Sequence, residues 1–230
     1  MRHYKLPDGR QFPSVTAIIG DCTDKSTPLT FWAANCVVDW IRQNCYMAEL
    51  GESAYYKVQD EQLELARKNF RDVQTTALDI GSEAHHAIEN FLKTGEEPKD
   101  PRDEVLSAFL AFLEFADEHK METLAVEERV VGDCFAGTLD WRGMMDGKRT
   151  ILDWKTNKGK IYKESHYQIA AYRSVVPDIE ACGCVRIDKE TGYADYKDTS
   201  KTYEQDLVVF DAMLNLFFER HPIIRKKAGL

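Results

Sequence analysis

Long apolar runs are absent from this chain of 230 residues. None approaches the roughly 18–20 consecutive apolar residues that a membrane-spanning helix needs. The first residues lead into Pro7-Asp8-Gly9 and not into an apolar segment, so we expect neither a signal peptide nor a membrane partner. A cytoplasmic location is the expectation that follows.

Cysteine pairs at metal-binding or redox spacing are also lacking. The six cysteines are scattered, only Cys182 and Cys184 are close together, and no C-x-x-C motif exists. This pattern argues against a zinc ribbon or a thioredoxin-like site and is typical of free thiols in a reducing compartment. No G-x-x-x-x-G-K-[ST] motif occurs, so we expect no ATP-driven motor in this chain.

Positive charge is in short supply, because the formal net charge is -9. This balance argues against a protein that coats nucleic acid through bulk charge. Local basic strips remain, one holding Lys155, Lys158, Lys160 and Lys163 and another running from Arg225 to Lys227. Each strip is either a nucleic-acid contact or an ordinary solvated surface.

Hydrophobic periodicity changes along the chain from helical spacing to the alternation typical of strands. We expect a short hairpin or an extended arm at 4–13. Helices are expected at 15–19, 27–47, 53–70, 77–92, 102–119, 165–176 and 202–220, and strands at 123–131, 135–142, 149–156, 181–188 and 193–198. This order predicts an α/β fold, with a central mixed β-sheet flanked by helices and an N-terminal helical addition.

The length and the 43% hydrophobic content suit a single domain over residues 1–230. Within it we expect a mostly helical N-terminal part at 1–75, a core at 76–222 and a basic tail at 223–230.

Two strand-like runs flank Asp146-Gly147, which is a strong signal for a β-hairpin turn. With these two residues as the turn, Asp140 faces Asp153, and Lys155 shares the face of Asp153. Facing like charges about 4.5–5.5 Å apart at Cβ are destabilising. A chain that keeps this pair is expected to hold a divalent cation between the two carboxylates.

The other face of that hairpin carries Leu139, Trp141, Leu152 and Trp154 and is expected to be the buried face, which leaves the acidic face open. Carboxylate oxygens suit Mg²⁺ or Mn²⁺, and such an ion polarises a phosphoryl oxygen. Lys155 would stabilise the negative charge that develops during phosphodiester hydrolysis. The other interpretation is a surface salt bridge between Lys155 and one carboxylate.

Four blocks of the sequence together resemble the PD-(D/E)XK nuclease superfamily, and within it the RecB-like exonuclease branch with its phage and mitochondrial-genome-maintenance-type members. The blocks are Gly81-Ser-Glu-Ala-His85, Gly137-Thr-Leu-Asp140, Ile151-Leu-Asp-Trp-Lys-Thr156 and Gln168-Ile-Ala-Ala-Tyr172. Phe12-Pro-Ser-Val-Thr16 is similar to the phage and mitochondrial members. The resemblance spans most of residues 12–172 and implies a restriction-endonuclease-like core.

The resemblance also implies roles for the residues of the acidic hairpin. Asp140 and Asp153 would ligate Mg²⁺ or Mn²⁺, and the main-chain carbonyl of Trp154 would be a further ligand. Lys155 would be the catalytic lysine.

The helical blocks would complete the site. The resemblance places His85 in the metal shell and lets Gln168 and Tyr172 face nucleic acid or brace the site. Without the resemblance, His85 would be interpreted as an ordinary residue at the edge of the core. Gln168 and Tyr172 would then only share one side of a helix. Glu127 is either a further acid near the site or an exposed strand carboxylate.

We therefore expect a metal-dependent DNA exonuclease that acts on single strands or DNA ends in phage or organelle-type replication, recombination or repair. If a phage encodes it, the location would be the host cytoplasm. Lys158, Lys160, Lys163 and the aromatic pair Phe31 and Trp32 are candidate DNA contacts.

Other interpretations stay open: a structure-specific endonuclease or nickase, or an inactive nucleic-acid-binding accessory protein. No iron–sulfur cluster is expected, because only Cys182 and Cys184 follow the Gln168 block. Any helicase or single-strand-binding protein would be a separate partner.

Overall fold

The computed structural model describes residues 2–50, 53–157, 159–188 and 191–230. The chain forms two compact units, Met1–Thr23 with Gly81–Leu230 and Asp24–Ile80. Helix α3 (Asp60–Thr94) contributes to both units. No helix in the described ranges combines the length and apolarity needed to cross a membrane.

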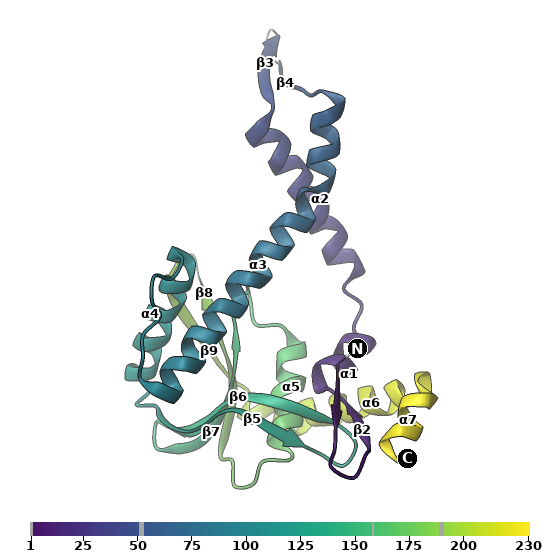
Figure 1. The fold of residues 1–230 in the computed structure, drawn as a ribbon, viewed down its shortest axis with the longest axis vertical. Coiled ribbons are helices and arrows are strands. Elements are labelled where there is room, and N and C mark those ends of the chain that lie inside the picture. The colour runs from purple at the N-terminus through teal and green to yellow at the C-terminus, as the bar shows by residue number, and fades with distance from the viewer. Residues whose placement is uncertain (1, 51–52, 158, 189–190) are drawn as a thin grey trace. The chain divides into compact units, whose positions relative to one another are not determined.

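A five-stranded sheet forms the centre of the larger unit (Figure 1). Its order is β5 (Glu122–Val131), β6 (Ala136–Met145), β7 (Lys148–Lys155), β8 (Ala181–Asp188) and β9 (Tyr193–Asp198). Strands β7 and β8 are parallel and are joined through α5 (Lys163–Arg173), whereas the other neighbours are antiparallel. The expected α/β fold with a central mixed sheet is thus confirmed.

Helices cover both faces of this sheet. Helices α1 (Val15–Cys22), α5 and α6 (Tyr203–Arg220), with the 3-10 turn η1 (Ser200–Thr202), pack on one side around Phe210 and Phe217. Helix α4 (Asp103–Glu118) packs on the other side, where Ile88 from the last turns of α3 joins Phe109 and Phe112. The sheet therefore separates two hydrophobic clusters.

The expectation that the acidic face of the β6–β7 hairpin is open is wrong. Ile151, Cys182 and Cys184 lie on that face and are fully buried, and Asp153 is only 1% exposed. The reason is the position of β7 in the middle of the sheet, with α5 packed against it. A central strand covered on both sides carries apolar residues on both faces, so alternation alone does not identify an open face.

The hairpin turn is confirmed. Met145 pairs with Lys148, and Asp146 and Gly147 form the turn with φ values of 51° and 76°. Positive φ at both turn residues belongs to the type I′ geometry that matches the twist of β-strands. The paired ladder extends to Trp141–Leu152 and stops there, so Asp140 and Asp153 face each other just beyond the last pair.

A second, short hairpin precedes α1. It consists of β1 (His3–Lys5) and β2 (Gln11–Pro13), as expected for residues 4–13. Ser14 follows and caps α1 by accepting a hydrogen bond from the Ala17 N–H at 3.0 Å. The segment expected as a basic tail forms helix α7 (Pro222–Ala228), which packs against β2.

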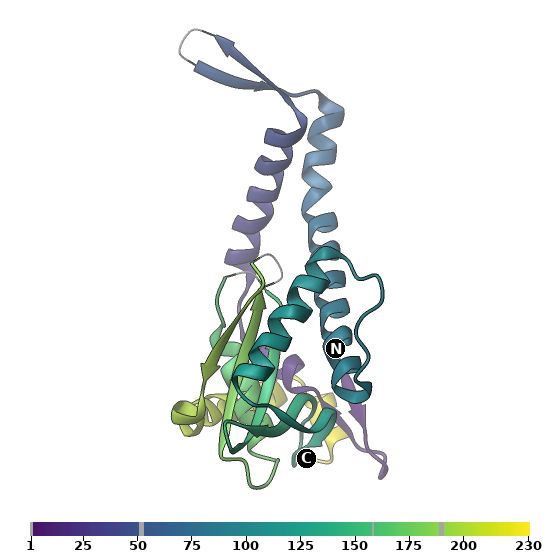
Figure 2. The same cartoon turned by 90° about the vertical axis from the view of Figure 1, so that its left-hand side faces the viewer.

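The smaller unit consists of α2 (Ser26–Asn44), the hairpin β3 (Tyr46–Leu50) with β4 (Ser53–Lys57), and the first part of α3 (Figure 2). The expected helix at 53–70 is wrong for 53–57, where Tyr55 and Tyr56 favour a strand. The separate helices expected at 53–70 and 77–92 are one continuous helix from Asp60. Trp32 packs edge-on against Phe70 at 6.5 Å within this unit, whereas Phe31 is exposed.

Candidate active site

Strands β6 and β7 separate at the point where the two acidic residues lie. Beyond Trp141–Leu152 the backbone ladder ends, and the Asp140 carboxylate takes its place. Oδ2 of Asp140 accepts the Trp154 N–H at 2.7 Å. One carboxylate oxygen thus replaces a main-chain acceptor, and the side chain is held in a fixed orientation. The role of the Trp154 carbonyl stays a prediction.

Three side chains close a ring next to Asp140. Lys155 Nζ lies 2.5 Å from Asp153 Oδ2 and donates to Gln168 Oε1 at 3.1 Å. The amide of Gln168 donates through Nε2 to Asp153 Oδ1 at 2.7 Å. The ring joins the end of β7 to α5. It fixes the orientation of the Gln168 amide, because Oε1 faces the Lys155 ammonium and Nε2 faces an Asp153 oxygen.

The contacts of Tyr172 and Gly137 give physical reasons for these two residues of the sequence blocks. Gln168 Nε2 lies 3.3 Å from the Tyr172 hydroxyl, one helical turn along α5. The ring of Tyr172 lies directly against Gly137, so that a Cβ on Gly137 would overlap the ring atoms. The glycine is therefore required by the close approach of α5 to β6. We call Asp140, Asp153, Lys155, Gln168 and Tyr172 the Asp–Lys cluster.

Burial and like charge shape the electrostatics of the cluster. Desolvation, followed by the charge of Asp153, raises the pKa of Asp140 well above its usual range. Desolvation also lowers the pKa of Lys155, but Asp153 and Asp140 outweigh it and leave that pKa raised. Lys155 is therefore an ammonium ion at neutral pH and serves as the internal counter-charge for two carboxylates.

His85 lies within electrostatic reach of this cluster. Its pKa is lowered, chiefly by desolvation, while Asp153 acts to raise it and Lys155 to lower it. The imidazole is thus neutral near pH 7, the form that accepts a proton or binds a metal. One turn earlier, a Cβ on Gly81 would lie 2.9 Å from Thr156 Oγ1, so the glycine lets α3 approach the end of β7 closely.

One further acid, Glu127, lies next to Asp140. Glu127, with φ of 53°, lies between the pairs Val126–Trp141 and Glu128–Leu139 and so next to Asp140 across the β5–β6 ladder. Its pKa is raised by desolvation and then by Glu89, although the side chain is exposed and solvent screens part of the effect. Glu89 itself is paired along α3, because Lys93 Nζ lies 2.5 Å from its Oε1 and His86 Nδ1 lies 3.3 Å from its Oε2.

The described lysines of the basic strip after β7 have partners outside the Asp–Lys cluster. Lys160 lies over the ring of Tyr162 at 5.7 Å, and Lys163 Nζ lies 3.6 Å from Asp206 Oδ1. Lys158 falls outside the described residues. Contacts of these lysines with nucleic acid stay a prediction.

The donor set of the cluster fits a hard divalent cation. When both carboxyl groups are ionised, they outnumber the one ammonium ion by one charge, and Glu127 lies nearby. Asp153 Oδ2 is buried and has no well-oriented hydrogen bond, and Asp140 Oδ1 has no hydrogen-bond partner among the described residues. Within those same residues, however, no three His, Cys, Asp or Glu side chains converge as a ready metal cage. The cluster thus resembles the sites that supply only one or two carboxylates to Mg²⁺ and leave the other positions to water and phosphate.

Comparison with known proteins gives distant structural likenesses and no family. No protein-family model matches the chain, and no curated protein matches it. A crystal structure of an alkaline exonuclease (LHK-Exo) from Laribacter hongkongensis is similar over 71% of this chain and 86% of that chain, with 14% sequence identity and a TM-score of 0.33. A likeness this distant leaves the function of the present chain to be argued from the Asp–Lys cluster.

Proposed function

We propose that this protein is a Mg²⁺- or Mn²⁺-dependent deoxyribonuclease of the PD-(D/E)XK type, and that it acts as an exonuclease on single-stranded DNA or DNA ends. The observation that carries the proposal is the Asp–Lys cluster at the point where β6 and β7 separate. A pair of carboxylates beside an ammonium ion is an arrangement that suits phosphodiester hydrolysis with a hard cation.

Asp140 and Asp153 would hold the ion through the oxygens that lack well-oriented hydrogen bonds, with His85 as a neutral neighbour. When bound, a hard divalent ion neutralises charge on the attacked phosphate and lowers the pKa of a water molecule.

Lys155 and Gln168 have distinct tasks in the proposed reaction. The Lys155 ammonium stabilises the extra negative charge on the phosphoryl oxygens as the water attacks. Gln168 holds Lys155 and Asp153 in register, because its amide contacts both side chains. Tyr172 braces Gln168 from the next helical turn. Gln168 and Tyr172 are therefore positioning residues.

End-labelled single- and double-stranded DNA, incubated in Mg²⁺, Mn²⁺ and EDTA, tests the proposal. We expect metal-dependent ladders from the wild type and a loss of about 10³-fold or more in Asp153→Asn and Lys155→Ala. Purified variants that cut at the wild-type rate would refute the assignment. Circular single-stranded DNA separates an exonuclease, which leaves the circle intact, from an endonuclease or nickase.

A further inference from the structure

The N-terminal hairpin is fastened to the strand that carries Asp140. The hydroxyl of Tyr4 on β1 lies 2.9 Å from Thr138 Oγ1 on β6. Thr138 is two residues before Asp140, and residues two apart on a strand point to the same face. The aromatic ring of Tyr4 is thereby held beside the Asp–Lys cluster. Its link to the sheet is a specific hydrogen bond between two side chains.

Two arginine side chains gather on this ring. The guanidinium of Arg2 lies 5.1 Å from the centre of the Tyr4 ring, and that of Arg129 lies 5.3 Å from it. Arg129 pairs with Thr138 across the β5–β6 ladder, and its Nη2 donates to the Lys5 carbonyl at 2.9 Å. Both arginines are exposed, and neither forms an ion pair with any carboxylate of the described residues.

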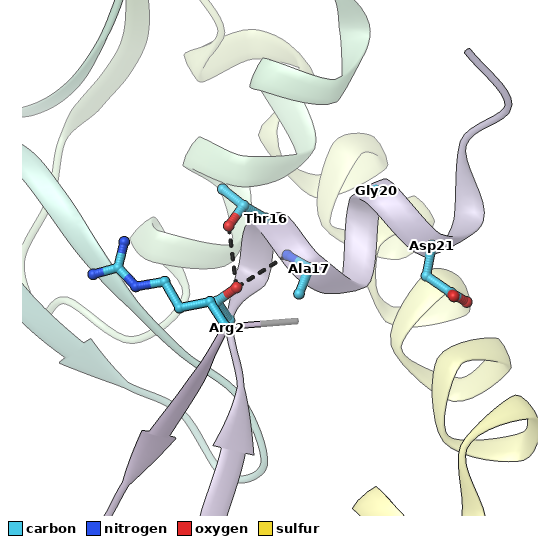
Figure 3. A pocket seen from close by; sticks show the side chains of 6 residues that line it. Arg2, Thr16, Ala17, Gly20 and Asp21 are labelled. Atoms are coloured by element: carbon cyan, nitrogen blue, oxygen red, sulfur yellow. Dashed lines mark hydrogen bonds between the residues drawn. The ribbon is translucent and has the colours of Figure 1, made fainter. Parts of the chain in front are cut away.

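The arginine pair borders both the acids and a cavity. Arg2 is close enough to Glu127 that its charge acts against the raised pKa of that carboxyl group. On its other side, Arg2 lines a cavity of about 420 Å³ together with Ser14, Thr16, Ala17, Gly20 and Asp21. Figure 3 shows Arg2 on one side of this cavity and Thr16 and Ala17 at the start of α1 on another.

We propose that Arg2 and Arg129, oriented by Tyr4, form a binding site for a backbone phosphate of the DNA strand whose scissile phosphate lies at the Asp–Lys cluster. The inference rests on the proposed nuclease function and names the part of the site that holds the strand. A guanidinium stacked on an aromatic ring keeps its N–H groups available for an anion, and the stacking limits the rotamers that must be ordered on binding.

The same hairpin supplies a matched control. Arg10 stacks on Phe12 at 5.0 Å in a closely similar way, but Asp8 Oδ2 lies 2.7 Å from its Nε and neutralises it. An arginine that is stacked yet paired should contribute little to phosphate binding. Arg2→Ala and Arg129→Ala therefore test unpaired cations, and Arg10→Ala tests the loss of a stacked arginine as such.

Two measurements decide the inference. The first is the affinity of each variant for a fluorescent single-stranded oligonucleotide in EDTA, in the Asp153→Asn background, over a range of salt concentrations. The second is kcat and KM for cleavage in Mg²⁺ in the otherwise unaltered protein. Thermal melting confirms that the exposed substitutions leave the fold intact.

We expect Arg2→Ala and Arg129→Ala each to weaken binding about tenfold and to reduce the slope of log Kd against log salt by about one. The KM should rise with kcat nearly unchanged, and Arg10→Ala should behave as the wild type. Wild-type affinity and salt slope in the Arg2→Ala, Arg129→Ala double variant would overturn the inference while leaving the nuclease proposal intact. A wild-type protein that binds DNA through these arginines but never cleaves it would overturn the nuclease proposal alone.

Discussion

The ring of Tyr172 lies against the backbone of Gly137 with no room for a Cβ atom between them. This contact sets the distance between α5 and β6, and with it the position of Gln168 relative to Asp153. Packing therefore links the segment from Gly137 to Asp140 with the segment from Gln168 to Tyr172, in addition to the hydrogen bond between Gln168 and Asp153.

Gly137→Ala is expected to destabilise the protein by about 1–3 kcal/mol and to lower cleavage, because the added methyl group displaces Tyr172. Urea unfolding and a cleavage assay measure the two effects. Gly20→Ala in α1 is the control, since a Cβ on Gly20 would meet no neighbouring group within 4 Å. Replacing Tyr172 by a smaller residue should restore part of the stability lost in Gly137→Ala. Independent, additive effects of the two substitutions would contradict the contact.

Asp140→Asn is expected to abolish cleavage and yet to stabilise the folded protein. The folded-state pKa of Asp140 is raised, chiefly by desolvation. Its contribution to stability is therefore fully present below the unfolded pKa of about 3.9 and is lost as the pH rises through the folded value. Above the folded pKa of Asp140 the variant should be more stable than the wild type by an amount on the order of 1 kcal/mol, because it removes a partly buried charge that faces Asp153.

Denaturant titrations at pH 4 and pH 8, with and without Mg²⁺, measure this effect. The difference between Asp140→Asn and the wild type should shrink at the lower pH. Added Mg²⁺ should stabilise the wild type and leave the variant unchanged. Asp72→Asn, on the exposed surface of α3, should show neither effect. Equal stabilisation of wild type and Asp140→Asn by Mg²⁺ would argue against a metal at the cluster.

Gln168→Ala is expected to lower kcat by about 10²-fold with a small change in KM, because Lys155 and Asp153 lose the amide that holds them in register. Tyr172→Phe removes only the contact at 3.3 Å and should cost far less. Steady-state kinetics on a labelled oligonucleotide separate the two. A rise in KM alone after Gln168→Ala would instead indicate that this residue contacts the DNA.

His166 should give the stability a pH dependence that is separate from the cluster. Its side chain is buried, its pKa is lowered chiefly by desolvation and then by Lys163, and Asp206 acts in the opposite direction. The fold prefers the neutral imidazole, so stability is present above the unfolded pKa of about 6.5 and is lost as the pH falls toward the folded value. His166→Gln should flatten this part of the curve in urea titrations between pH 5 and pH 8. An unchanged curve would mean that another group is responsible.

The arrangement of the hairpin was predictable because it depends on local rules. Asp146-Gly147 set the turn, and the turn set the register that places Asp140 near Asp153. The α/β order was likewise readable from periodicity. The closeness of Gln168 to Lys155 followed from resemblance alone, since no local rule relates residues on α5 and β7.

Other features depend on tertiary packing and gave no local signal. The burial of Asp153 comes from α5 covering the central strand, and alternation within one hairpin carries no information about that helix. The end of the strand ladder at Trp141 also gave no local signal, because the Asp140 side chain accepts the hydrogen bond there in place of a backbone carbonyl. The strands at 46–57 were missed since their tyrosines stand in a charged segment that otherwise reads as helix.

The hydrogen bond from the Trp154 N–H to Asp140 determines how this carboxylate can coordinate an ion. With Oδ2 committed to the backbone, only Oδ1 remains for a ligand, and rotation of the carboxyl group would break the bond. If Asp140 ligates an ion as proposed, monodentate coordination through Oδ1 is therefore favoured. Small octahedral ions such as Mg²⁺ tolerate this, whereas Ca²⁺ requires a larger coordination number that bidentate carboxylates often supply. In the proposed metal site, the end of this strand ladder would thus favour ions of small radius.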